Sequence, residues 1–368
     1  MNNIKLKNIE FLRLIGCFAI VCFHLFFGEL RLLFPDIDIY TSKQFIYNAQ
    51  KAVDLFFILS GLFFALYLNT NQPLFDFMKK KVIRLYPIAI TIVIISFLAS
   101  LAGIVKFNLY ANILILLNIS GTPMLSNLVG KTQIGLFWYV SSMLWVLGIY
   151  FYLLKNYEKK TCNLIIFLAV FFCYSFLICA RNGIIGAYQD TFYYIFNVGF
   201  MRAAGGIGIG YFIGEWWKSN SDKIEQKTLK FWQKLLITIL ECACTYFIFK
   251  YLLRKRINIK NDMIFIGDFV VIIMLFLSKK GYISQLLNDT ILGDVWMIFS
   301  KYTYSVYMVH KMIFAFLTEL HWKNYPEFIH VHPIINVIFV LGLVLSAGIF
   351  LYHFVEKPCT KYLSKKWL

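Results

Sequence analysis

The chain has 368 residues, of which 60% are hydrophobic and 15% are charged, and its mean hydropathy is +0.68. Soluble domains carry about a quarter charged residues, so this composition excludes an ordinary soluble domain. The formal net charge of +17 does not indicate nucleic-acid binding, because the basic residues lie mostly in short loops between apolar runs, where the positive-inside rule accounts for them.

Apolar runs of about 20 residues, long enough to cross a bilayer as helices, recur along nearly the whole chain. We therefore predict an all-α, polytopic transmembrane bundle in a single domain, residues 1–368, with about ten spans. A shorter apolar segment at 108–119 is expected to be re-entrant or interfacial. The predicted spans are 9–29, 50–69, 82–104, 134–154, 162–181, 191–217, 231–252, 263–278, 297–318 and 333–354.

Lysine is concentrated in alternate loops and in the C-terminal tail, which predicts that both termini lie in the cytoplasm at a bacterial cytoplasmic membrane. One loop disagrees, because Arg254, Arg256 and Lys260 fall on the outer side. Either a span near 231–278 is miscounted, or that outer loop meets an anionic acceptor. The predicted cytoplasmic loops are 70–81, 155–161, 218–230 and 279–296.

The first span contains two polar residues, Arg13 and His24, which are unfavourable inside a membrane and therefore indicate a functional or structural role. A charge at the bilayer centre costs about 2.5–3.5 kcal/mol on insertion scales. The two residues are 11 positions apart, which is within about 20° of three full helical turns and a rise of about 16 Å, so they share one face. This spacing places an anion binder at the membrane surface and a titratable base at mid-depth.

The second span places Asp54 inside an apolar run that begins after Lys51. An unpaired carboxylate is expensive there, so we expect a partner such as His24 or an Arg, in a catalytic site or in a structural ion pair between helices. Ser60 and Gly61 further along this span indicate a close helix contact rather than a nucleophile.

The third span begins with Lys81 and Arg84, which lie one turn apart on a shared face. Together with Arg13 they could form a positively charged entrance that binds phosphates at the cytoplasmic surface. The alternative is ordinary snorkelling of basic side chains at a helix end.

Later spans add aromatic and imidazole groups. Trp138 belongs to an aromatic cluster at a helix start, as in an aromatic belt. Tyr307 precedes His310 by one turn, which fits a proton path, a sugar contact or a packed histidine. Cys242 and Cys244 lack a second ligand pair, so no metal site is expected.

Five segments in order resemble motifs of the acyltransferase 3 family of integral membrane acyltransferases. They run from about residue 9 to 360 and so cover nearly the whole chain. Two departures, Ser142–Trp145 in place of a paired-Glu stretch and the lack of a fused periplasmic domain, suggest the stand-alone, single-domain type. The matching segments are Arg13-x10-His24 for Arg-x10-His, Ala52–Gly61 for Gly-Val-Asp-x-Phe-Phe-x-x-Ser-Gly, Lys81–Pro87 for Arg-x-x-Arg-x-x-Pro, Tyr304–His310 for Ser-Tyr-Ser-x-Tyr-x-x-His, and Glu356–Pro358 for Glu-x-Pro.

The resemblance implies acyl-CoA, most simply acetyl-CoA, as cytoplasmic donor and a hydroxyl of a cell-envelope polysaccharide sugar as acceptor. In this interpretation His24 is the base or a transient acyl carrier, and Asp54 orients it. The other predicted site residues are Arg13, Lys81 and Arg84 for the donor phosphates or an oxyanion, and Trp138, Tyr307 and His310 for the acceptor. The main alternative is a transporter or flippase for a glycan intermediate, because intramembrane polar residues also mark substrate pathways.

Overall fold

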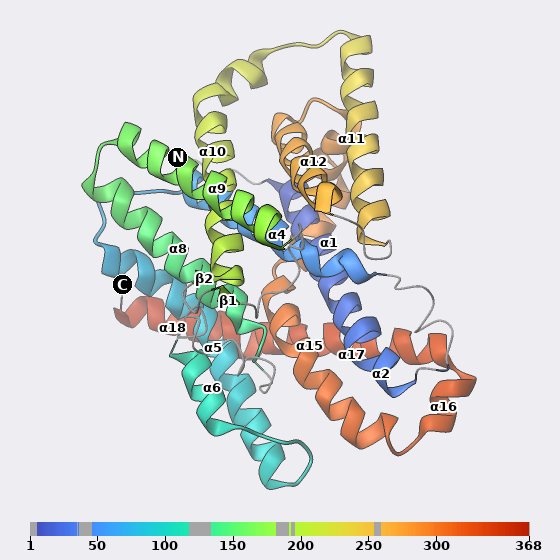
Figure 1. Ribbon diagram of the computed structural model, residues 1–368. Helices are drawn as coiled ribbons and strands as arrows, with labels where there is room; N and C mark the ends of the chain where they lie inside the picture. The colour runs from blue at the N-terminus through green and yellow to red at the C-terminus, as the bar shows by residue number, and fades with distance from the viewer. Residues whose placement is uncertain are drawn as a thin grey trace.

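The computed structural model describes residues 6–34, 36, 46–117, 134–181, 191–192, 196–253 and 259–367. These residues are almost entirely helical (Figure 1), which confirms the predicted helical bundle. Within the described ranges the β-structure is limited to β1 (Thr191–Phe192) and β2 (Phe196–Asn197), which pair as a short antiparallel ladder.

The first half of the chain forms α1 (Lys7–Phe23), the π-helix η1 (His24–Leu30), α2 (Arg31–Leu33), the 3-10 helix η3 (Tyr47–Lys51), α4 (Ala52–Leu66), α5 (Leu74–Leu101), α6 (Leu109–Leu116), α8 (Phe137–Asn156) and α9 (Lys159–Arg181). The second half forms α10 (Val198–Gln226), α11 (Phe231–Leu252), α12 (Ile259–Ser278), α13 (Tyr282–Asp289), α14 (Ile291–Ser300), α15 (Thr303–Leu317), the π-helix η6 (Thr318–Trp322), α16 (Pro326–Val331), α17 (Pro333–Leu351), the π-helix η7 (Tyr352–Glu356) and α18 (Lys357–Trp367).

Seven segments among the described residues are long and apolar enough to cross a membrane, and they match seven of the predicted spans. The predicted spans 191–217, 263–278 and 297–318 fall on α10, α12 and α15, so the count of ten is not confirmed. For α15 the reason is length, because its 15 residues are too few to span alone. The seven segments are Lys7–Leu33, Asn48–Leu66, Leu74–Leu101, Phe137–Asn156, Lys159–Cys179, Phe231–Leu252 and Pro333–Trp367.

Two doubtful segments of the prediction have different outcomes. The apolar stretch predicted at 108–119 contains the short helix α6, whose eight residues pack against α5 and α8. Its re-entrant or interfacial position stays a prediction. The basic loop at 254–256 lies outside the described residues.

Glycines bring α4 and α10 into backbone contact near the centre of the bundle (Figure 1). A Cβ added at Gly61 would overlap the backbone of Ile207, and one added at Gly210 would overlap the backbone of Ile58. Small residues let helix backbones approach this closely in membranes, as the sequence predicted. The contact fixes the position of α4, which carries Asp54 and Ser60.

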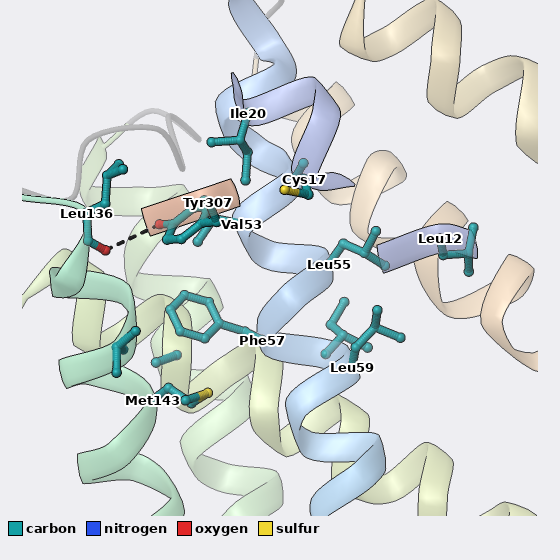
Figure 2. Packing of buried hydrophobic residues seen from close by; sticks show 14 of the residues in the cluster. Leu12, Cys17, Ile20, Val53, Leu55, Phe57, Leu59, Leu136, Met143 and Tyr307 are labelled. Atoms are coloured by element: carbon teal, nitrogen blue, oxygen red, sulfur yellow. Dashed lines mark hydrogen bonds between the residues drawn. The ribbon is translucent and has the colours of Figure 1, made fainter. Parts of the chain in front are cut away.

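The buried core joins α1, α4, α8 and α15. Figure 2 shows side chains of these helices packed together, with the Tyr307 hydroxyl donating a hydrogen bond to the carbonyl oxygen of Leu136. The Cys17 thiol of α1 also lies 3.3 Å from the carbonyl oxygen of Thr303 at the start of α15. The core therefore holds the four helices that carry most of the predicted site residues.

Candidate active site

A cavity of about 440 Å³ lies among α1, α4, α5, α8 and α15. Its volume is within the range of small-molecule sites, about 300–1,000 Å³. Arg13, Lys81 and Arg84 all line it, together with Glu10 and a set of apolar and aromatic side chains. The predicted convergence of the three cations is thus confirmed, whereas their role in binding phosphates stays a prediction.

Arg13 and Lys81 are held by neighbouring side chains, one carboxylate and two aromatic rings. Arg13 Nη1 donates to Glu10 Oε2 at 2.8 Å, and its guanidinium lies 5.0 Å from the centroid of the Phe63 ring. Lys81 Nζ lies 5.5 Å from the Phe77 ring. Three positive groups facing one negative group leave an excess of positive charge, which attracts an anionic ligand.

The cationic wall also meets the last part of the chain. Glu356 is buried, accepts a hydrogen bond of 2.6 Å from Ser305 Oγ, and interacts electrostatically with Arg84. Its contacts with α15 and α5 tie the closing motif to the cavity.

The inner wall of the cavity, lined by Ser60, Tyr139 and Tyr307, has serine and tyrosine hydroxyls as its polar groups. Ser60 Oγ donates to the carbonyl oxygen of Phe56 at 2.7 Å and lies 3.2 Å from the hydroxyl of Tyr139. A serine hydroxyl bonded to its own helix is not poised as a nucleophile, in agreement with the sequence interpretation. Tyr307 forms part of this wall, and its hydroxyl lies 3.3 Å from the carbonyl oxygen of Leu136 (Figure 2).

Two histidines form a pair behind Tyr307. His310 Nε2 lies 3.1 Å from His24 Nδ1, which in turn lies 3.1 Å from the carbonyl oxygen of Ile20. A carbonyl oxygen only accepts hydrogen bonds, so a proton on His24 Nδ1, shared between the two contacts, satisfies both and leaves His24 Nε2 unprotonated. That nitrogen has the form of a general base.

The histidine pair is separated from the cavity. In the part of the chain that the structure describes, neither His24 nor His310 lines the cavity, whereas Tyr307 does. The Tyr307 and His310 ring centroids are 6.0 Å apart, and those of His310 and His24 are 5.0 Å apart. The order from the cavity inward is therefore Tyr307, His310 and His24.

The sequence did not predict the direct contact between His24 and His310, which lie 286 residues apart. Each histidine stands in an apolar run, where burying a polar side chain costs free energy. This shared feature was the signal in the sequence that could have linked the two. A further feature is that the chain switches from α- to π-helix at His24. Such turns are frequent at functional sites.

The expected contact between Asp54 and His24 is wrong, and the alternative partner, an arginine, is correct. Arg202 Nε and Nη2 donate to the two oxygens of Asp54 at 3.0 and 2.7 Å, and both side chains are 1% exposed. The reason is that α4 packs closely on α10, which carries Arg202. Trp138 lies 5.7 Å from the Arg202 guanidinium and does not line the cavity, among the residues described.

A second buried ion pair, which the sequence analysis missed, lies near the first. Lys51 is paired with Asp262, and the Tyr251 hydroxyl is bonded to both. Lys51 and Asp262 also interact electrostatically with Asp54. Two cations and two anions thus balance inside the bundle.

Other polar groups surround His24 from η1, α15 and η6. Lys311 interacts electrostatically with both His24 and Glu29, and the Glu29 carboxylate lies beside Thr318. Glu29 and Lys311 are half-buried. Within the described residues, no cluster of three or more His, Cys, Asp and Glu side chains could hold a metal ion.

Comparison with known proteins adds one match. The family model described as an acyltransferase domain matches residues 6–353 of the chain. The matched region begins before α1 and ends within η7, so it contains the cavity and both histidines. No curated protein and no solved structure matches the chain.

Proposed function

Because the chain belongs to the acyltransferase 3 family, we propose that it transfers an acetyl group from acetyl-CoA to a sugar hydroxyl of a cell-envelope polysaccharide. The family supports an acyltransferase with an acyl donor and an acceptor. The observation that carries the finer proposal is a cavity with three cations on its wall and, behind Tyr307, a pair of histidines of which His310 is buried and His24 is half-buried.

The cations favour a phosphate-bearing donor. The phosphate groups of coenzyme A match arginine guanidinium groups, which bind such oxygens in a bidentate manner, and Lys81 adds a point charge. The basic segment Lys79–Lys81 lies near the start of α5, and the positive-inside rule assigns such segments to the cytoplasm, where acyl-CoA is made. In this proposal the cavity is the donor site and both termini are cytoplasmic.

In the proposed reaction the acceptor oxygen attacks the thioester carbonyl carbon, and the bond between that carbon and sulfur breaks. His24 Nε2 takes the hydroxyl proton and returns it to the departing thiolate, so the products are an O-acetyl sugar and free coenzyme A. A covalent variant has His24 carrying the acyl group before the sugar oxygen takes it. Arg13, on the same helical segment as His24, would stabilise the developing oxyanion.

The acceptor side is assigned to the polar groups around His24 that do not line the donor cavity. Glu29 and Lys311 offer a hydrogen-bond acceptor and a donor of the kinds that bind sugar hydroxyls. Both follow His24 or His310 along their helices, away from the cationic wall. A sugar bound there would present a hydroxyl to the histidine pair.

The test is transfer of label from radiolabelled acetyl-CoA to polysaccharide in membrane vesicles. His24→Ala should lower kcat by about 10²–10⁴-fold, as loss of a general base does. Arg84→Gln should raise KM for acetyl-CoA about tenfold, because it removes a charged hydrogen-bond partner of the donor. Lys323→Gln, an exposed charge in the linker after η6, should change neither.

The transporter alternative gives a different result in the same vesicles. It predicts movement of glycan across the membrane without acetyl-CoA and no label on the sugar. Full transfer by correctly inserted His24→Ala protein would exclude the proposed role of that histidine.

A further inference from the structure

Tyr307 closes the inner end of the donor cavity. Its side chain lines the cavity and yet is only 4% exposed. Phe56 and Tyr139, which line the same wall, flank it with ring centroids at 6.3 and 6.0 Å. The three rings therefore form an aromatic floor, and Tyr307 is the member that contacts His310.

The region behind this floor is filled. Figure 2 draws Tyr307 within one cluster of buried side chains, which includes Cys17, Ile20 and Val53. His310, on the far side of the ring, is fully buried. Close-packed interiors contain few voids larger than a water molecule, so an acyl chain has no room to continue past the ring.

The position of the floor is also fixed. The Tyr307 hydroxyl donates to the Leu136 carbonyl oxygen just before α8, and the Tyr139 hydroxyl lies within hydrogen-bond distance of Ser60. The floor is thus bonded at two of its three rings to neighbouring elements. A fixed floor discriminates by length, whereas a soft wall would yield to a longer chain.

We propose that Tyr307 is the specificity-determining residue that restricts the donor to short acyl groups. This inference rests on the proposed function, because it takes the cavity as the acyl-CoA site. With the phosphates on the cationic wall, the acyl end of the donor points at the floor, and the histidine pair lies behind it. A two-carbon acyl group adds little beyond the carbonyl, whereas each further methylene has to displace the Tyr307 ring.

The experiment compares kcat/KM for acetyl-, butyryl- and octanoyl-CoA in vesicles containing the wild type, Tyr307→Phe, Tyr307→Leu or Tyr307→Ala. A single methylene in a fixed pocket changes specificity by about 10–200-fold. The wild type should therefore prefer acetyl- over octanoyl-CoA by at least about 100-fold. Tyr307→Phe keeps the ring but loses the bond to Leu136, so it should lower this ratio less than Leu and Ala, which should lower it at least about tenfold.

The matched control is Tyr67→Ala, the same substitution at a tyrosine that lines the cavity but is 55% exposed. It should leave the acetyl-to-octanoyl ratio unchanged. Equal use of both donors by the wild type overturns the inference, and so does an unchanged ratio in folded Tyr307→Leu protein. A wild type that transfers no acyl group from any coenzyme A ester overturns the proposed function itself, which distinguishes the two failures.

Discussion

Replacing Arg202 with Met should destabilise the protein far more than replacing Arg202 and Asp54 together. Both side chains are 1% exposed and share two hydrogen bonds of 3.0 and 2.7 Å. Arg202→Met leaves a buried carboxylate without its partner, and Asp54→Leu leaves a buried guanidinium. Removing one member of a buried pair costs about 3–5 kcal/mol, because the other charge stays desolvated.

The double variant Asp54→Leu/Arg202→Met removes both charges at once. Apolar replacement of a buried pair is often neutral or stabilising, so its stability should lie within about 1 kcal/mol of the wild type. The magnitude of the coupling energy from the cycle should then reach at least about 5 kcal/mol, because the two single losses add and the double variant recovers nearly all of them. The nearby Lys51 loses its attraction to Asp54 and its repulsion from Arg202 together in the double variant, so the net effect on Lys51 is small.

The assay is equilibrium unfolding in detergent micelles, followed by tryptophan fluorescence. A control cycle on Glu319 and Lys323 uses an ion pair of 2.6 Å whose side chains are 41% and 50% exposed. Exposed pairs are worth about 0–1 kcal/mol, so this cycle should show little coupling. The reasoning is refuted if the two cycles give equal coupling, or if the double variant is less stable than either single variant.

Two further predictions follow from the helix contact and the cavity wall. Gly61→Ala should lower the free energy of unfolding by about 1–3 kcal/mol or more, because its Cβ overlaps the backbone of Ile207, whereas Gly342→Ala has open space and should be neutral or stabilising in the same unfolding assay. Glu10→Gln should lower KM for acetyl-CoA about three- to tenfold, because it releases Arg13 from its carboxylate partner. A rise in KM would instead mean that Glu10 orients Arg13 for the donor.

The features that depend on one helix were predictable from the sequence. The apolar runs predict the helices, and the spacing of Arg13, Lys81 and Arg84 at helix ends predicts a shared cationic surface. Lys81 and Arg84 point the same way because they share one face of α5, whereas their meeting with Arg13 of α1 at one cavity depends on how the helices pack. The glycines of α4 and α10 predict close packing for a similarly local reason.

The pairings between helices were not predictable. The apolar pattern shows that Asp54 lies inside a hydrophobic run. It does not show whether the helix with His24 or the helix with Arg202 packs against that residue. Arg202 lies 148 residues away, and the choice between Arg202 and His24 depends on how α4 and α10 pack. The contact of His24 with His310 has the same origin.

The most direct test of the central claim is the acetyl content of surface polysaccharide, measured by NMR in three strains. One strain lacks the gene, one carries the wild-type gene, and one carries His24→Ala produced and inserted at the wild-type level. The account predicts that deletion removes an O-acetyl resonance and that the wild-type gene alone restores it. An identical spectrum in all three strains would contradict acetyl transfer to this polysaccharide, and restoration by His24→Ala would contradict the role of His24.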